Sequence, residues 1–177
     1  TLIANTHKRQ YTATFKKAKS TLSNAARMSE AQFGYDFAGI NQLCNTNSGT
    51  DHPETKQAAC AILNGTLKGA HFYYGMNKLE GYTIDSQFFN GMWSFQSFPD
   101  SLPIYTLSDE QLLILSSRIG DYGCENRSTV FINTAGKQTG TVCYGLIDIN
   151  GVSKPNKEVK CTKGSNRYHV QIQEIVL

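Results

Sequence analysis

The chain has 177 residues, of which 40% are apolar and 18% charged, and its formal net charge is +3. This length and balance are typical of one globular domain and exclude a disordered chain. The 17 Lys and Arg residues are spread along the sequence, so the sequence by itself does not indicate nucleic-acid binding. Its apolar runs are only a few residues long, too short for a transmembrane helix.

A long helix is predicted at the start of the chain. Apolar or small residues recur there in steps of three and four, which is the spacing of one helical face. They are Tyr11, Phe15, Ala18, Leu22, Ala25, Ala26, Ser29 and Phe33. No Pro or Gly intervenes before Gly34, a residue type that often follows the end of a helix. We therefore expect one helix from about Leu2 to Gly34, ~45 Å long.

A short second helix is expected next, with Asp51 as its cap, Pro53 in its first turn and Asn64-Gly65 at its end. Strands follow beyond about residue 80, where short apolar runs alternate with turn residues. The expected strands cover residues 104–107, 112–115, 129–132, 141–149 and 170–176, with a hairpin at Ala135-Gly136-Lys137. The aromatic-rich stretch 71–103 is expected to be irregular and to pack on the sheet.

These elements predict an α+β fold, in which a long N-terminal helix packs on a mostly antiparallel C-terminal sheet. We expect a single domain over residues 1–177, made of the helix (1–34), a variable helix and loop region (35–103) and the sheet with its C-terminal loop (104–177).

No pair of the five cysteines has the C-x-x-C spacing of zinc or redox motifs. Cysteines spaced beside Gly- and Asn-rich loops favour an oxidising compartment. Cys44 and Cys60 flank an Asn-rich loop and form the preferred disulfide. The predicted hairpin brings Cys124 and Cys143 to opposite arms, which makes them the second pair. Cys143 with Cys161 is the alternative to that pair.

Three segments resemble the type IV pilins and type II secretion pseudopilins. Residues 8–34 (KRQYTATFKKAKSTLSNAARMSEAQFG) look like the second half of the long pilin helix. Residues 104–109 (IYTLSD) are similar to the "YTLADG" strand and turn of such heads, although Glu110 stands in place of the family's Gly. Residues 145–156 (GLIDINGVSKPN) are similar to the "vDvNGxxxPN" segment, whose matching residues are Asp148, Asn150, Gly151, Pro155 and Asn156.

The resemblance implies a structural subunit, major or minor, of a bacterial type IV pilus or related filament, serving adhesion, motility, DNA uptake or secretion. Its partners would be copies of itself, other pilins and the inner-membrane assembly machinery, with a host surface or DNA as further candidates. The subunit would reach an extracellular cell-surface filament through the inner membrane and periplasm. We expect an apolar half-helix, inserted in the membrane, to precede Thr1.

Asp148, Asn150 and Asn156 could supply oxygen ligands to calcium, an ion that some pseudopilins bind. Three ligands are about half of a full site, so we prefer the interpretation that these side chains cap their own turn. No other metal or cofactor is expected.

Catalysis has little support in the sequence, since His7, His52, His71 and His169 are scattered and no nucleophile elbow or phosphate loop is present. We therefore expect no enzymatic activity. The alternative to a filament subunit is a secreted binding module that recognises a glycan or a protein through the aromatic residues between Phe72 and Phe98.

Overall fold

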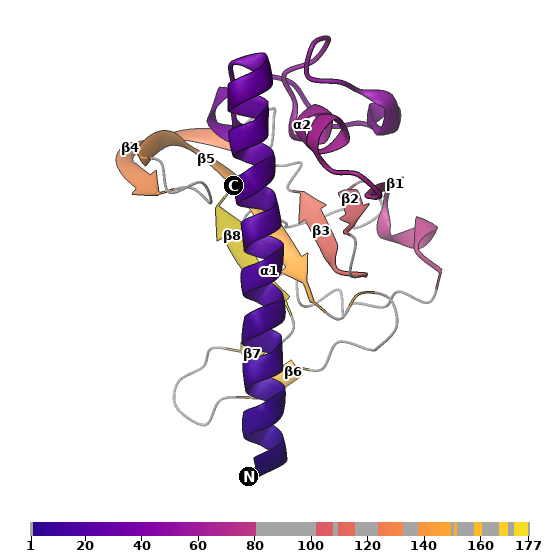
Figure 1. Ribbon diagram of the computed structural model, residues 1–177, viewed down its shortest axis with the longest axis vertical. Coiled ribbons are helices and arrows are strands. Elements are labelled where there is room, and N and C mark those ends of the chain that lie inside the picture. The colour runs from indigo at the N-terminus through magenta and orange to yellow at the C-terminus, as the bar shows by residue number, and fades with distance from the viewer. Residues whose placement is uncertain are drawn as a thin grey trace.

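A computed structural model describes most of the chain. It covers residues 2–80, 102–107, 110–115, 124–132, 138–149, 151, 158–160, 167–169 and 172–176. Within them, a single long helix lies across an antiparallel sheet (Figure 1), so the α+β class expected from the sequence is correct.

Helix α1 spans Leu2–Phe33 without a break, as the pattern of apolar residues predicts. Its 32 residues correspond to ~48 Å at 1.5 Å per residue. The helix ends at Gly34, which has a φ of +81° and donates its backbone N–H to Glu30 O at 3.1 Å. This left-handed position suits glycine, which has no Cβ to clash there. In Figure 1, α1 crosses in front of the sheet, and its N-terminal end extends past the main strands.

In the part of the chain that the structure describes, the main sheet has six antiparallel strands. They are β1 (His71–Tyr74), β2 (Pro103–Thr106), β3 (Leu112–Leu115), β4 (Cys124–Ile132), β5 (Gln138–Asp148) and β8 (Ile172–Val176). Their order is β1-β2-β3-β5-β4, and β8 also pairs with β5. Strand β5 is therefore central, because its C-terminal half pairs with both β3 and β8. A separate two-stranded ribbon joins β6 (Glu158–Lys160) to β7 (Arg167–His169).

Most of the predicted strands are present. Residues 112–115 form β3. The runs expected at 104–107, 129–132, 141–149 and 170–176 overlap β2, β4, β5 and β8, respectively. Strands β4 and β5 pair antiparallel, and the expected turn at Ala135-Gly136-Lys137 lies outside the described residues. The expectation that residues 71–103 are irregular is wrong at their start, where β1 pairs with β2.

The second helix begins later than predicted. Helix α2 spans Ala59–Thr66, and its N-cap is Ala58 rather than Asp51. Residues 51–58 form a turn instead, because the Asp51 carboxylate binds Lys56 rather than the N–H groups of a helix start. Nor does Asn64-Gly65 end the helix, which continues one residue further. Gly65 is needed for a different reason, since a Cβ there would lie 2.7 Å from the Pro53 ring.

The core lies between α1, α2 and one face of the sheet. Alternate sheet residues face it, which is the period-two pattern of a strand. They are Tyr105, Leu107, Leu113, Leu115, Ile147 and Ile149. The intervening residues Leu112, Ile114 and Leu146 are also buried, so β3 is apolar on both faces. This explains its unbroken Leu-Leu-Ile-Leu sequence.

Short 3-10 helices connect these elements, namely η1 (Phe37–Gly39), η2 (Ser48–Thr50) and η3 (Met76–Lys78). Among the described residues, no helix combines the length and the apolar character needed to cross a bilayer.

Candidate functional site

The inner face of α1 is the first feature with functional potential. Ala18, Leu22 and Ala26 are completely buried in the core, and Ala25 is 1% exposed. Small residues dominate this face, so the helix backbone lies close to the rest of the domain. Ser29 is also fully buried. The predicted apolar stripe is therefore the surface by which α1 is attached to its own domain.

The N-terminal part of that stripe is less covered. Tyr11 and Phe15 are partly buried and pack against the core cluster, as Phe33 does at the other end. Between them, Thr14 O accepts a hydrogen bond from Gln111 Nε2 at 3.2 Å. Because Gln111 immediately precedes β3 and is buried, this bond fixes the height of α1 on the sheet.

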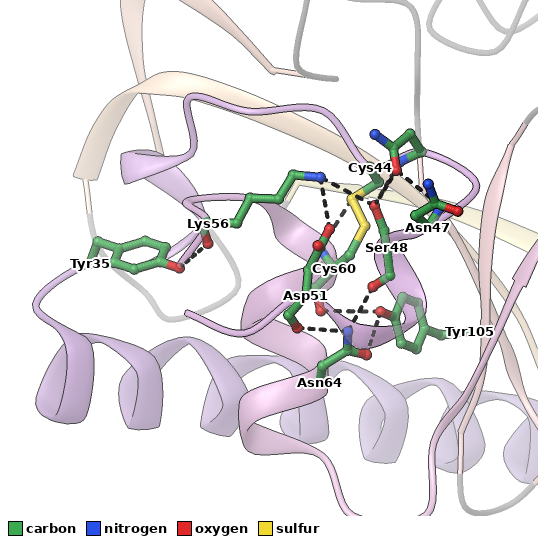
Figure 2. The surroundings of a disulfide bond; sticks show 10 residues. Tyr35, Cys44, Asn47, Ser48, Asp51, Lys56, Cys60, Asn64 and Tyr105 are labelled. Carbon is green, nitrogen blue, oxygen red and sulfur yellow. Dashed lines mark hydrogen bonds and ion pairs between the residues drawn. A yellow bond between two sulfur atoms is a disulfide. The ribbon is translucent and has the colours of Figure 1, made fainter. Parts of the chain in front are cut away.

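The second feature is a loop fixed by a disulfide bond between Cys44 and Cys60 (Figure 2), the pair preferred from the sequence. Their Cα atoms are 5.8 Å apart, and the bond attaches the loop to the buried first turn of α2. Cys60 N also donates to Cys44 Sγ at 3.1 Å. The loop between them carries η2 and the displaced start of α2.

The Asn64 side chain of α2 makes hydrogen bonds to the backbone of this loop. Its amide nitrogen donates to Ser48 O and to Asp51 O, both at 2.8 Å, and its carbonyl oxygen accepts from the Tyr105 hydroxyl at 2.7 Å. That hydroxyl also lies 3.1 Å from Cys60 O. Figure 2 shows how these bonds connect α2, the loop and strand β2. Asn64 thus uses both ends of its carboxamide to join three segments.

Burial raises the pKa of Tyr105 above its ordinary value of 10.0, and the nearby Asp51 carboxylate adds to the rise. The hydrogen bond to Asn64 acts in the opposite direction and is the smaller effect. Tyr105 is therefore a neutral hydrogen-bond donor at physiological pH, not a proton-transfer group. Its position suits a structural role.

An ion pair between Lys56 and Asp51 joins two parts of the same loop. Lys56 Nζ lies 2.7 Å from Asp51 Oδ2 and 3.4 Å from Ser48 Oγ, and both charged side chains are about four-fifths buried. The Tyr35 hydroxyl donates to Lys56 O at 2.9 Å. Within the turn, the backbone N–H groups of Thr55 and Lys56 both donate to His52 O at 3.0 Å.

The two turns that carry the pilin resemblance meet in space. Glu110 has a φ of +64°, the left-handed conformation that glycine adopts most easily. Gly151 has a φ of +59°, and a Cβ there would lie 2.0 Å from Glu110 O. The turn after β2 and the turn after β5 therefore contact each other through the backbone, and Gly151 permits that contact.

The calcium candidate is only partly described. Asp148 is fully buried at the end of β5, where its backbone is opposite Leu112 of β3 and Ile172 of β8. Asn150, Pro155 and Asn156 lie outside the described residues. The described part of the chain contains no group of three acidic, His or Cys residues arranged to hold a metal ion.

The backbone brings two of the remaining cysteines to facing positions. The β4–β5 register aligns Cys124 directly with Cys143, so the backbone brings the preferred pair to facing positions. Cys161 lies outside the described residues. The bond between Cys124 and Cys143 remains a prediction.

Sequence reasoning missed the network around Tyr105 and Asn64. The two residues are 41 positions apart, and each was assigned an ordinary local role, as part of a strand and as a helix end. A buried Tyr needs a partner for its hydroxyl, which was the one available signal.

Comparison with known proteins returned no matching family model, no similar curated protein and no similar solved structure.

Proposed function

We propose that this chain is the head of a structural subunit of a type IV pilus or related filament, and that it is not an enzyme. The observation that carries the proposal is the unbroken 32-residue helix α1, which is attached along one face to an antiparallel sheet. A helix about three times the usual length has no evident use in a small globular domain unless it continues into something else.

The division of α1 into two parts supports this proposal. Between residues 18 and 29, the side chains on the inner face of α1 are buried in the core. Tyr11 and Phe15, nearer the N-terminus, are only partly buried by the described residues. Figure 1 draws the N-terminal end of α1 beyond the main strands. A helix held at one end and extending at the other is suited to joining a head to a stem or to neighbouring subunits.

The segments that resemble pilins lie more than 30 residues apart in the sequence, and Glu110 and Gly151 are in backbone contact because β3 and β5 pair with Leu112 opposite Asp148. This contact follows from the strand pairing, so the support that these segments give is their sequence. The alternative of a binding module gains less, because Phe72 packs its ring 5.3 Å from that of Tyr105, within the core.

Immunogold electron microscopy of cells and of sheared surface filaments tests the proposal, with antibody raised against this domain. We expect gold particles at intervals along filaments, and no labelling of filaments from a strain that lacks the gene. Filaments that remain unlabelled while the antibody detects the protein elsewhere in the cell would refute it.

A further inference from the structure

The two cysteines of the Cys44–Cys60 disulfide bond lie in different surroundings. Cys60 is completely buried in the first turn of α2, whereas Cys44 is partly exposed in the loop. Figure 2 shows the bond joining the loop to the helix. In thiol–disulfide exchange, access decides which of the two sulfurs is attacked. A thiol in solution therefore reaches this bond from the Cys44 side.

The Cys44 sulfur also lies at the N-terminus of α2. It accepts a hydrogen bond from the Cys60 backbone N–H at 3.1 Å. The N-cap residue, Ala58, makes no side-chain hydrogen bond there, and the first turn of α2 contains no acidic residue. A thiolate at Cys44 would accept the same bond more strongly, because a helix N-terminus favours negative charge. Of the two sulfurs, Cys44 Sγ is therefore the better placed to be an anion once the bond is broken.

Breaking the disulfide bond leaves the other contacts of the loop in place. The Asn64 amide still bonds Ser48 O and Asp51 O, and the ion pair between Lys56 and Asp51 lies within the loop. Losing the cross-link costs ~3 kcal/mol in the chain-entropy model, which is less than the free energy of unfolding of about 5–15 kcal/mol that is typical of a protein. We therefore expect the chain to stay folded when the bond is reduced.

We propose that the Cys44–Cys60 bond is a reversible exchange site for thiols, at which the attacking thiolate bonds to Cys44 Sγ. The bond between the two cysteines then breaks, its electron pair passes to Cys60 Sγ, and Cys60 takes up a proton. When the partner is a dithiol, its second thiolate attacks the partner's own sulfur in this mixed disulfide and expels the Cys44 thiolate. The partner leaves as a disulfide, and both cysteines of the chain are reduced. The same steps in reverse restore the bond.

This inference goes beyond the proposed filament and does not depend on it. Both cysteines belong to one loop and one helix of this chain, so the exchange can be measured on the chain alone. Absence of exchange would leave the filament proposal intact, and unlabelled filaments would leave this proposal intact.

The test is incubation of the folded 177-residue chain with reduced glutathione, followed by excess N-ethylmaleimide to trap free thiols. Trypsin cleaves after Lys56, so the two cysteines fall in separate peptides, 28–56 and 57–68, for mass spectrometry. We expect at least about tenfold more glutathione on Cys44 than on Cys60, which carries the maleimide instead. In concentrated urea the difference should shrink to within about twofold, because unfolding exposes both sulfurs.

Two matched variants give a second measurement of access. Cys60→Ala leaves Cys44 as a thiol, Cys44→Ala leaves Cys60, and both variants lack the same bond. Oxidised glutathione should modify the first at least about tenfold faster than the second while circular dichroism shows both to be folded. If either variant is unfolded, the peptide measurement on the original chain decides alone. Absence of glutathione from Cys44 of the original chain, an equal or larger amount on Cys60, or equal rates in the two folded variants would overturn the proposal.

Discussion

Leu22→Ala is the substitution that probes the attachment of α1 most sharply. Leu22 is fully buried in the core that α1 shares with the sheet. The change removes three carbon groups from this core, or about 2.4 kcal/mol at 0.8 kcal/mol each. The cavity left behind adds to this cost, so we expect the free energy of unfolding to fall by about 3 kcal/mol. For a chain of this size, the melting temperature should fall by about 6–12 °C.

Urea denaturation followed by circular dichroism measures this loss, with Met28→Ala as the matched control on the same helix. Met28 is 42% exposed, so its truncation should cost less than about 1 kcal/mol. The m-value should be unchanged in both variants, because the folded and unfolded states keep their compactness. A Leu22→Ala variant as stable as Met28→Ala would refute the packing of this helical face on the domain.

Three further predictions concern the loop and the motif turns. Burial raises the pKa of Tyr105 in the folded chain but not in the unfolded chain. The free energy of unfolding should therefore fall as pH rises above about 10, by up to about 1.4 kcal/mol per pH unit. In urea denaturation at a series of pH values, Tyr105→Phe should make this fall less steep. Replacing both Cys44 and Cys60 by Ala should cost about 3 kcal/mol in urea denaturation, since the bond closes a loop with a sequence separation of 16; no loss would contradict the bond. Gly151→Ala should destabilise more than Gly34→Ala by at least about 1 kcal/mol, because both have positive φ but only Gly151 faces a backbone oxygen; equal losses would contradict the turn contact.

The sequence predicted those parts of the fold that local patterns determine. The three- and four-residue spacing from Tyr11 to Phe33 requires a helix, and Gly34 ends it as glycine commonly does. The apolar run Leu112–Leu115 reads as a buried strand, and it is one. Cys44 and Cys60 could be paired because they flank one short loop.

Local patterns failed where contacts between distant segments decide the structure. Asp51 is a good helix cap by type, but the ion pair with Lys56 uses its carboxylate, so α2 begins at Ala59. Strand β1 has no alternating pattern and forms because Pro103–Thr106 lies beside it.

Backbone NMR of the isotope-labelled chain measures directly whether α1 is one continuous helix that packs on the sheet. We predict helical Cα and Cβ chemical shifts without interruption from residue 2 to residue 33, together with NOEs between the Gln111 side-chain amide and the backbone of α1 around Thr14. Non-helical shifts within residues 11–29, or the absence of NOEs from α1 to the sheet, would contradict it.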